Sequence, residues 1–228
     1  MLKTHFIDTG LINYQKAWDF QKELQKKLLS QKQNENKATE QYLLYCEHPH
    51  VYTLGKSGKE ENLLIQDDFL KKINAEFYNI DRGGDITYHG PGQIVGYPIF
   101  DLESMNIGVR SYIEKMENAV IRTLAEFNIH TERLDEAIGV WLKKNNGQRA
   151  EKICAIGVKV SRMITMHGFA LNVYTDLNYF NYINPCGFSD KGVTSMEKEL
   201  GEKIIIKDVK NILLDSIIKE FNLDLRRG

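Results

Sequence analysis

The sequence predicts a single α+β domain in which helices pack on a mixed, largely antiparallel sheet. Two observations predict this class. The β-rich runs come in clusters and do not alternate strictly with helices, and three long segments repeat apolar residues at helical spacing. No internal repeat divides the 228 residues, so we expect one domain over residues 1–228.

The first helix and four strands are expected in the first hundred residues. Apolar residues recur at helical spacing over about 13–29, with Lys, Glu and Gln on the other face, which predicts an amphipathic helix. The segment 30–40 is rich in Gln, Asn and Lys, so we expect a flexible surface loop there. The expected strands are Tyr42–Cys46, Val51–Leu54, Phe77–Ile80 and Ile94–Phe100. Pro98 lacks a backbone N–H, which favours a sheet edge or a bulge.

The second half of the chain begins with a long amphipathic helix over 109–127. Three strands at hairpin spacing follow, with the first turn at Asn145–Gly147: Ala137–Leu142, Lys152–Val160 and His167–Val173. Thr194–Glu197 has the spacing of a capping box, and Gly201 is a suitable C-terminal stop for the short helix between them. A last amphipathic helix is expected over 209–221.

A glycine-rich stretch, Arg82–Gln93, stands between two expected strands, and four of its twelve residues are glycine. Inside a helix each glycine costs about 1 kcal/mol and a proline about 3 kcal/mol, so we expect turn and loop. Glycine also allows positive φ and lets a ligand approach the backbone, which is typical of a binding-site wall. A plain bend between two strands explains the composition as well, and both interpretations stay open at this point.

Composition excludes several classes of protein. Thirty basic and thirty-one acidic side chains leave a net charge of −1, so no overall field recruits nucleic acid or an anionic membrane. No apolar run approaches the ~18 residues of a membrane span, and the first residues lack the apolar core of a signal peptide. The three cysteines are far apart and form no CxxC pair, which argues against disulfides. We therefore expect a cytoplasmic protein with no nucleic-acid or membrane partner.

Common cofactor motifs are missing from the sequence. The phosphate loop and the dinucleotide-binding fingerprint both fail on spacing, and neither H-E-x-x-H nor G-x-S-x-G occurs. His48 and His50 flank a proline, but no Cys or carboxylate stands nearby at ligand spacing. A structural or pocket-lining role for this pair is favoured over metal binding.

A thiol and an amine remain as candidate reactive groups. Cys186 lies between proline and glycine in a turn that could present its sulfur at a pocket mouth. A free thiol titrates near 8.5, so a nucleophilic role needs a nearby cation, and Lys152 leads an apolar strand that could point into the same site. Cys46 and Cys154 lie inside apolar strands and are expected to be buried and inert. A surface lysine and an incidental turn cysteine are the alternative.

Several motifs together resemble the lipoyl(octanoyl) transferases of the biotin/lipoate protein ligase superfamily, which implies the fold of that superfamily. The motifs occur in the family's order over about residues 40–200: Glu47–Pro49 with Val51–Gly55, Arg82–Gln93 continuing through Tyr97–Pro98, Lys152–Val158, His167–Asn172 and Pro185–Gly187. The second reads R-G-G-x-x-T-Y-H-G-P-G-Q, which is long enough to be specific, whereas P-C-G alone would mean little.

The resemblance implies transfer of an octanoyl group from the phosphopantetheine thioester of acyl carrier protein to a lysine ε-amine. The acceptors would be lipoyl domains of 2-oxoacid dehydrogenase subunits and the glycine cleavage H protein. Cys186 would be the nucleophile and form an acyl-thioester. Lys152 would lower the pKa of that thiol and then shuttle protons. No ATP, metal or other cofactor is required. An ATP-dependent lipoate ligase and a non-catalytic module that binds carrier or lipoyl domains are the alternatives.

The resemblance also implies an acyl pocket, in which each buried CH₂ of an octanoyl tail gains roughly 0.8 kcal/mol. Its walls would be Arg82, Gly83, Gly84, Asp85, Ile86, Thr87, Tyr88, His89, Ala155, Ile156, Gly157, Gly168, Phe169 and Ala170. Cys154 departs from the family, where Ala or another small residue is expected, and it adds a second thiol close to Lys152.

A basic surface for the acidic carrier protein is a further hypothesis from the sequence. Its members would be Lys143, Lys144, Arg149, Lys159 and Arg162. A solvated hairpin surface is the alternative.

Overall fold

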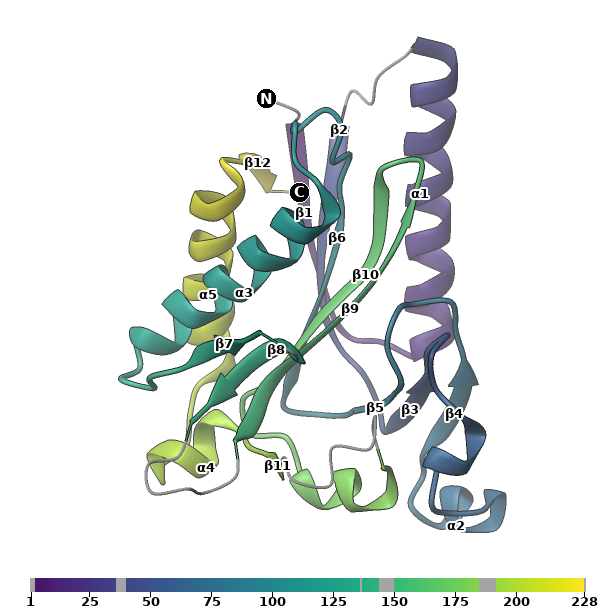
Figure 1. The fold of residues 1–228 in the computed structure, drawn as a ribbon, viewed down its shortest axis with the longest axis vertical. Coiled ribbons are helices and arrows are strands. Elements are labelled where there is room, and N and C mark those ends of the chain that lie inside the picture. Colours follow the sequence, from purple (N-terminus) through teal and green to yellow (C-terminus); the bar gives the residue numbers. More distant parts are fainter. Residues whose placement is uncertain (1–2, 36–39, 136, 144–149, 185–191, 228) are drawn as a thin grey trace.

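The structure is a computed structural model in which residues 3–35, 40–135, 137–143, 150–184 and 192–227 are described, and over these residues it confirms the expected α+β architecture (Figure 1). A nine-stranded sheet runs in the order β12-β1-β2-β6-β10-β9-β8-β7, with β11 paired to β9. Its strands are β1 Lys3–Leu11, β2 Glu40–Glu47, β6 Gln93–Ile99, β7 Glu132–Leu134, β8 Ala137–Leu142, β9 Glu151–Ser161, β10 Ile164–Asn172, β11 Gly192–Val193 and β12 Asp224–Arg227.

The large sheet is mixed and largely antiparallel, as expected. From β2 through β6, β10, β9 and β8 to β7 every neighbouring pair is antiparallel. Parallel pairs occur where β1 meets β2 and β12, and where β11 meets β9.

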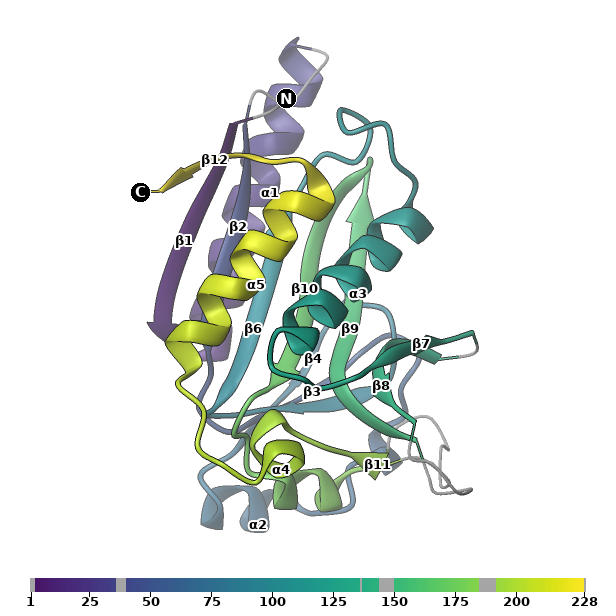
Figure 2. The same cartoon turned by 90° about the vertical axis from the view of Figure 1, so that its left-hand side faces the viewer.

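Helices cover both faces of this sheet (Figure 2). One face carries α1 Tyr14–Glu35, and the other carries α3 Val109–Ala125 and α5 Ile206–Phe221. The side chains of β2 alternate between two cores, as a strand requires. Leu43 and Tyr45 pack with α3 and α5, whereas Leu44 packs with α1. The short helix α4 Met196–Leu200 precedes α5.

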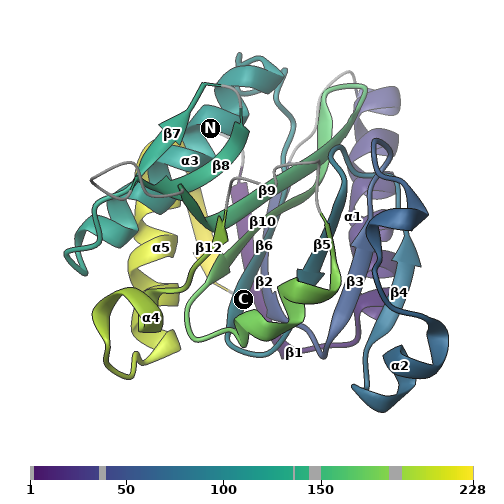
Figure 3. The same ribbon diagram turned by 60° about the horizontal axis from the view of Figure 1, so that its bottom comes forward.

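A smaller three-stranded sheet stands beside the large one and holds the glycine-rich stretch (Figure 3). Its order is β4-β3-β5, with β3 Val51–Leu54, β4 Glu76–Asn79 and β5 Ile86–His89. The prediction that Arg82–Gln93 is turn and loop throughout is therefore wrong for five residues, the four of β5 and Gln93, which begins β6. Ile, Thr and Tyr favour an extended chain, and the glycines only bracket them. Helix α2 Asp67–Lys72 and the 3₁₀ turns η1 Glu60–Asn62 and η2 Leu177–Tyr182 surround this sheet.

Other predicted boundaries need correction. Helix α1 continues to Glu35, so the loop expected over 30–40 is wrong for residues 30–35, and Glu40 already belongs to β2. Gln, Lys and Glu are good helix formers, and they extend the helix beyond its last apolar contact. Pro98 lies in the central strand β6 and not at a sheet edge. The pairing of β6 with β10 runs only from Gln93 to Gly96 and so ends before Pro98. The Thr165 hydroxyl donates to the Pro98 carbonyl at 2.7 Å.

The remaining predictions of elements hold with small shifts. Helices α3 and α5 and strands β3, β8, β9 and β10 lie where the patterns placed them. The N-cap of α4 is Ser195, one residue later than the start of the expected capping box, and Gly201 ends the helix at a φ of 70° as expected. The turn at Asn145–Gly147 lies outside the described residues.

Candidate active site

Lys152 is the second residue of β9 and lies where three strands meet. It pairs with Trp141 of β8 on one side and with Val193 of β11 on the other. Its ammonium nitrogen lies 4.6 Å from the centroid of the Trp141 ring. The amide of Thr194 donates to the Lys152 carbonyl oxygen at 3.0 Å, which fixes the backbone of this residue.

The floor beneath Lys152 is formed by a glycine and a buried carboxylate. Gly139 of β8 has a φ of 126°, and a Cβ built on it would lie 3.3 Å from Cε of Lys152. The Gly139 amide donates to Oε1 of Glu117 at 2.9 Å. Burial raises the pKa of Glu117, and the nearby charges of Arg133 and Lys152 oppose that shift. Strand β8 and helix α3 thus bring a negative group close to the lysine.

Cys186 lies outside the described residues, but the chain on both sides of it is held by backbone hydrogen bonds. On the N-terminal side, the amide of Asn184 donates to the carbonyl of Asn62 at 2.8 Å. On the C-terminal side, Gly192 pairs with Glu151 at the start of β9. Gly192 and Val193, the first described residues after Cys186, therefore pair with Glu151 and Lys152.

An aromatic stack anchors η2, which precedes Cys186 in the chain. The Tyr179 ring lies parallel to His50, with centroids 4.1 Å apart, and parallel to Tyr88, with centroids 4.9 Å apart. His50 Nδ1 also lies 2.7 Å from the Tyr88 hydroxyl. The Tyr52 hydroxyl donates to the Tyr179 carbonyl at 2.9 Å. Tyr88 of the glycine-rich stretch thus packs against η2, the last described helical turn before Cys186.

The first half of the glycine-rich stretch packs against β9. The Gly83 amide donates to the Val158 carbonyl at 2.9 Å. The guanidinium of Arg82 donates to the Thr53 carbonyl at 2.8 Å. A Cβ on Gly157 would lie 3.0 Å from the Gly83 oxygen, so the two backbones approach closely. Glycine here serves contact between chain segments as well as any contact with a ligand.

Small residues form two cross-strand pairs between β9 and β10, separated by one bulkier pair. Ala155 pairs with Ala170, and Gly157 pairs with Gly168. The bulkier pair between them, Ile156 and Phe169, packs with the core beneath α3 and α5. The pocket residues expected from these two strands therefore divide into a strip of small residues and a pair that faces the core.

Two buried histidines lie behind the glycine-rich stretch. His48 Nε2 lies 2.7 Å from the Tyr97 hydroxyl, and His89 Nδ1 lies 2.7 Å from Oε1 of Gln93. Burial lowers the pKa of His48 to about 4 and that of His89 to about 3. Both rings are therefore neutral at pH 7 and act as hydrogen-bonding groups.

Asp81, directly before the glycine-rich stretch, joins it to both strands of the β9–β10 hairpin. Its two carboxylate oxygens lie 2.9 Å from His167 Nε2 and 2.5 Å from Lys159 Nζ. The hydrogen bond from His167, together with that from Lys159, holds the pKa of Asp81 well below its usual range. This carboxylate is charged at all physiological pH values.

The thiols of Cys46 and Cys154 are enclosed in the protein. Both residues are at most 1% exposed, and burial raises the pKa of each thiol. The prediction that both are buried is confirmed. Cys154 is close to Lys152 in the sequence, but its thiol is shielded from solvent and held in the protonated form.

Two described members of the hypothesised basic surface, Lys143 and Lys159, lie far apart in the fold. Lys143 follows the pair Leu142–Glu151, whereas Lys159 lies eight residues further along β9, roughly 25 Å away at the rise of a strand. Lys143 pairs with Glu132 and Lys159 with Asp81. Lys144 and Arg149 lie outside the described residues, as does the turn between them.

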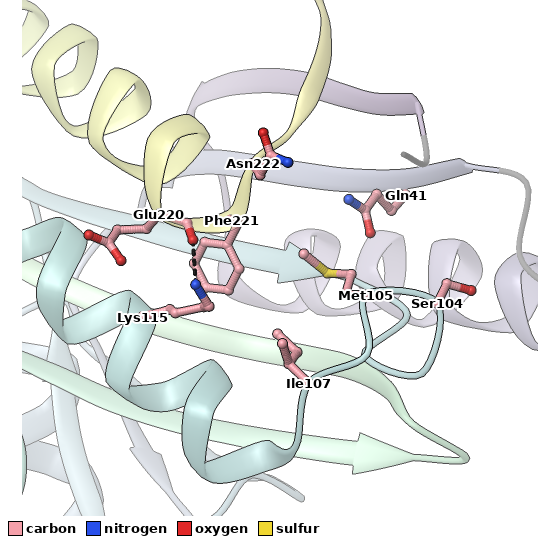
Figure 4. Close-up of a pocket in the computed structure, with 8 residues that line it drawn as sticks. All are labelled: Gln41, Ser104, Met105, Ile107, Lys115, Glu220, Phe221 and Asn222. Carbon is pink, nitrogen blue, oxygen red and sulfur yellow. Dashed lines mark hydrogen bonds between the residues drawn. The ribbon is translucent and has the colours of Figure 1, made fainter.

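A hollow of about 340 Å³ opens at the C-terminal end of α5 (Figure 4). It is lined by Gln41, Ser104, Met105, Ile107, Lys115, Glu220, Phe221 and Asn222. Lys115 donates to the Glu220 carbonyl at 2.7 Å, which caps the last turn of α5. None of the lining residues belongs to the sequence motifs.

Neither a metal cluster nor a membrane-spanning helix is found in the described part of the chain. No three His, Cys, Asp or Glu side chains come together there as a metal site would need, and His48 and His50 both have protein partners. Among the helices in that part, none is long and apolar enough to cross a membrane.

Comparison with known proteins identifies the family of this constellation. Residues 13–218 match the family described as the lipoyl protein ligase A/B catalytic domain. The chain belongs to this family. The octanoyltransferase of Bacteroides fragilis is 53% identical over 212 residues, which cover 93% of this chain and 95% of that protein. The octanoyltransferase of Cytophaga hutchinsonii is 51% identical over 225 residues, covering 96% and 92%.

Solved structures agree on the fold. The bipartite lipoate protein ligase of Thermoplasma acidophilum has a TM-score of 0.72 at 15% identity, and the match covers 100% of this chain and 87% of that one. The resemblance to lipoyl(octanoyl) transferases and their superfamily fold is confirmed, and the protein is an enzyme of the acyltransferase class.

Three residues around Lys152 were missed from the sequence: Glu117, Gly139 and Trp141. Gly139 carried a signal, because a glycine inside an expected strand often marks the close approach of another group. The contact of Trp141 with Lys152 depends on the register of β8 against β9, and the turn sequence between these strands does not specify that register. Glu117 stands on a helix between apolar neighbours, where a buried carboxylate is unusual.

Proposed function

We propose that the enzyme transfers an octanoyl group from octanoyl-acyl carrier protein, by way of a thioester on Cys186, to a lysine ε-amine of a lipoyl domain. The observation that carries the proposal is the position of Lys152, at the junction of β9 and β11 where the segment containing Cys186 ends. Relatives more than 50% identical over nearly the whole chain carry the name octanoyltransferase, which supports the acyl group.

In the first step, the Cys186 thiolate attacks the thioester carbonyl of the donor. The C–S bond to phosphopantetheine breaks as the new C–S bond forms, so one thioester replaces another. The positive charge of Lys152 favours the thiolate before the attack. Lys152 then gives its proton to the departing pantetheine thiolate and becomes a neutral amine.

In the second step, the neutral lysine amine of the acceptor attacks the acyl-enzyme. A C–N bond forms and the C–S bond to Cys186 breaks, which releases the thiolate. Neutral Lys152 accepts the proton lost by the attacking nitrogen and returns to its charged state. The cycle therefore restores both groups, and its products are an amide and free pantetheine thiol.

The acyl group arrives already activated, so the proposed reaction requires neither ATP nor a metal. An amide is more stable than a thioester, which makes the second step favourable. For the octanoyl chain we propose the strip of small residues on β9 and β10 together with the glycine-rich stretch. Seven methylene and methyl carbons at roughly 0.8 kcal/mol each are enough to hold the chain without a charged anchor.

Incubation with octanoyl-acyl carrier protein in the absence of ATP tests this proposal. The intact protein should gain one octanoyl mass, and peptide mapping should place it on Cys186. Addition of a lipoyl domain should remove that mass and octanoylate the domain. Cys186→Ser should abolish the adduct, whereas Cys154→Ala, a matched change of a buried cysteine, should retain it.

The alternatives give different results in the same experiment. A lipoate ligase would modify the lipoyl domain only with ATP and free acid, and a binding module would form no adduct. An adduct that persists in Cys186→Ser would refute the cysteine mechanism. Lys152→Met should lower the rate of acylation by at least 100-fold, because both the charge and the proton carrier are lost.

A further inference from the structure

The side chain of Lys152 is seated on an aromatic ring. Trp141 is 2% exposed, and its indole N–H donates to the Ala137 carbonyl at 2.9 Å, which fixes the orientation of the ring. The ammonium of Lys152 lies 4.6 Å from the ring centroid, within the ~6 Å range of a cation–π contact. Because Trp141 and Lys152 are cross-strand partners, the backbone already brings the two side chains together.

Gly139 clears the path of the lysine side chain to this ring. A Cβ on Gly139 would lie 3.5 Å from Cδ and 3.3 Å from Cε of Lys152, so the stem of the lysine passes directly over the glycine. The Gly139 amide is tied to Glu117, which keeps β8 in place under the stem. The lysine is therefore guided along its length before its charge reaches the ring.

Among the described residues, charged and titratable groups from three elements act on Lys152 or on its neighbours. Glu117 approaches from α3, Arg133 from β7 acts on Glu117, and the Cys154 thiol lies on β9 itself. A carboxylate attracts the ammonium without fixing its position. The face of an aromatic ring holds the ammonium over the ring and favours the charged form of the lysine. The ring thus adds a directional contact that the surrounding charges do not provide.

We propose that Trp141 is a positioning residue that holds the Lys152 ammonium where it acts on the reactive thiol. The inference rests on the proposed function, since it assumes that Lys152 stabilises the Cys186 thiolate. Trp141 touches neither substrate nor reacting atoms in this scheme. Its effect is transmitted through Lys152 alone, which makes the proposal separable from a general role in folding.

The rate of alkylation of Cys186 by iodoacetamide, followed by peptide mapping against pH, is the test. Trp141→Leu should move the midpoint of this profile upward by about half to one pH unit, the amount that loss of a cation–π contact allows. Trp141→Phe keeps an aromatic face and should restore most of the wild-type midpoint. The buried thiols of Cys46 and Cys154 should react slowly in every variant.

A double-mutant cycle separates positioning from structure. In the Lys152→Met background, Trp141→Leu should produce no further shift, because the group through which Trp141 acts is gone. An additional shift of the same size in that background would overturn the proposal. The Lys152 εCH₂ protons should also resonate upfield in the wild type, and lose this ring-current shift in Trp141→Leu.

Failure of the inference and failure of the proposed function are distinguishable. If Lys152→Met leaves the thiol profile unchanged, the role proposed for Lys152 is wrong. If Lys152→Met shifts the profile and Trp141→Leu does not, only the role of Trp141 is wrong. If Trp141→Leu does not fold, the Trp141→Phe profile and the ring-current shift of the wild type decide, and an unshifted εCH₂ resonance refutes the contact.

Discussion

Acidification from pH 7 to pH 5 should destabilise the protein through two buried histidines. The pKa values of about 4 for His48 and about 3 for His89 lie below the ordinary value of 6.5 that each regains in the unfolded chain. The unfolded chain therefore binds a proton at each position from pH 6.5 downward, whereas the folded protein does not until its own lower pKa is reached. Stability is full above pH 6.5 and falls with pH below it.

The magnitude follows from these pKa values. Between pH 7 and pH 5 each histidine costs about 2 kcal/mol, and the two together cost about 3 to 4 kcal/mol of unfolding free energy. That is a large part of the 5–15 kcal/mol typical of a folded protein. Burial also lowers the pKa of His167, which acts in the same direction, while the raised pKa of Glu117 opposes it.

Urea denaturation at pH 7, 6 and 5, followed by tryptophan fluorescence, measures this dependence. His89→Gln should reduce the slope near pH 5 by about 1.4 kcal/mol per pH unit, the contribution of one proton. His130→Gln changes an exposed histidine and should leave the slope unaltered. Equal stability of the wild type at pH 7 and pH 5, or an unchanged slope in His89→Gln, would refute the reasoning.

Two further changes test the surroundings of the site by thermal and urea unfolding. Gly139→Ala should cost about 1–3 kcal/mol, because a φ of 126° suits only glycine and the new Cβ would lie 2.6 Å from the Cys154 oxygen. Gly108 has a φ of −84° and open space around it, so Gly108→Ala should change the free energy of unfolding by no more than about 0.5 kcal/mol. Equal melting temperatures for Gly139→Ala and Gly108→Ala would contradict the argument. Asp81→Asn should lower the free energy of unfolding by about 2 kcal/mol at pH 7. The difference in unfolding free energy from the wild type should narrow below about pH 4, where the carboxyl of the unfolded chain protonates. A difference that stays constant with pH would exclude the charge of Asp81 as the cause.

Much of the architecture could be predicted from the sequence because the spacing of apolar residues is regular in the long helices and the β-rich runs are distinct. Apolar spacing placed α3 and α5, and β-rich runs placed β3 and β8 to the residue. Strands β1, β7 and β12 were among those that were not predicted. They lie at or next to the edges of the sheet, where one or both faces stay exposed and the hydrophobic pattern is weak. The end of α1 was misplaced because its last turns make few apolar contacts.

The site was predictable to the extent that it depends on single residues. Lys152 stands out as a lysine at the head of an apolar strand, and the glycine-rich stretch stands out by composition. The seat of Lys152 depends on the partner strand: Trp141 and Gly139 reach it through hairpin register, and Glu117 reaches it through helix packing. These contacts are tertiary, so no local pattern could reveal them.

The pairing of β1 with β12 has a consequence for how the chain folds. Lys3 pairs with Asp224, so β1 is completed by a strand that follows more than 200 residues later in the chain. Closing so long a loop is entropically slow, and high contact order of this kind retards folding. Until then the outer edge of β1 exposes unpaired amides and carbonyls, which can template association with other chains. Truncation of β12 should therefore increase aggregation during expression more than it reduces catalysis at the distant Lys152.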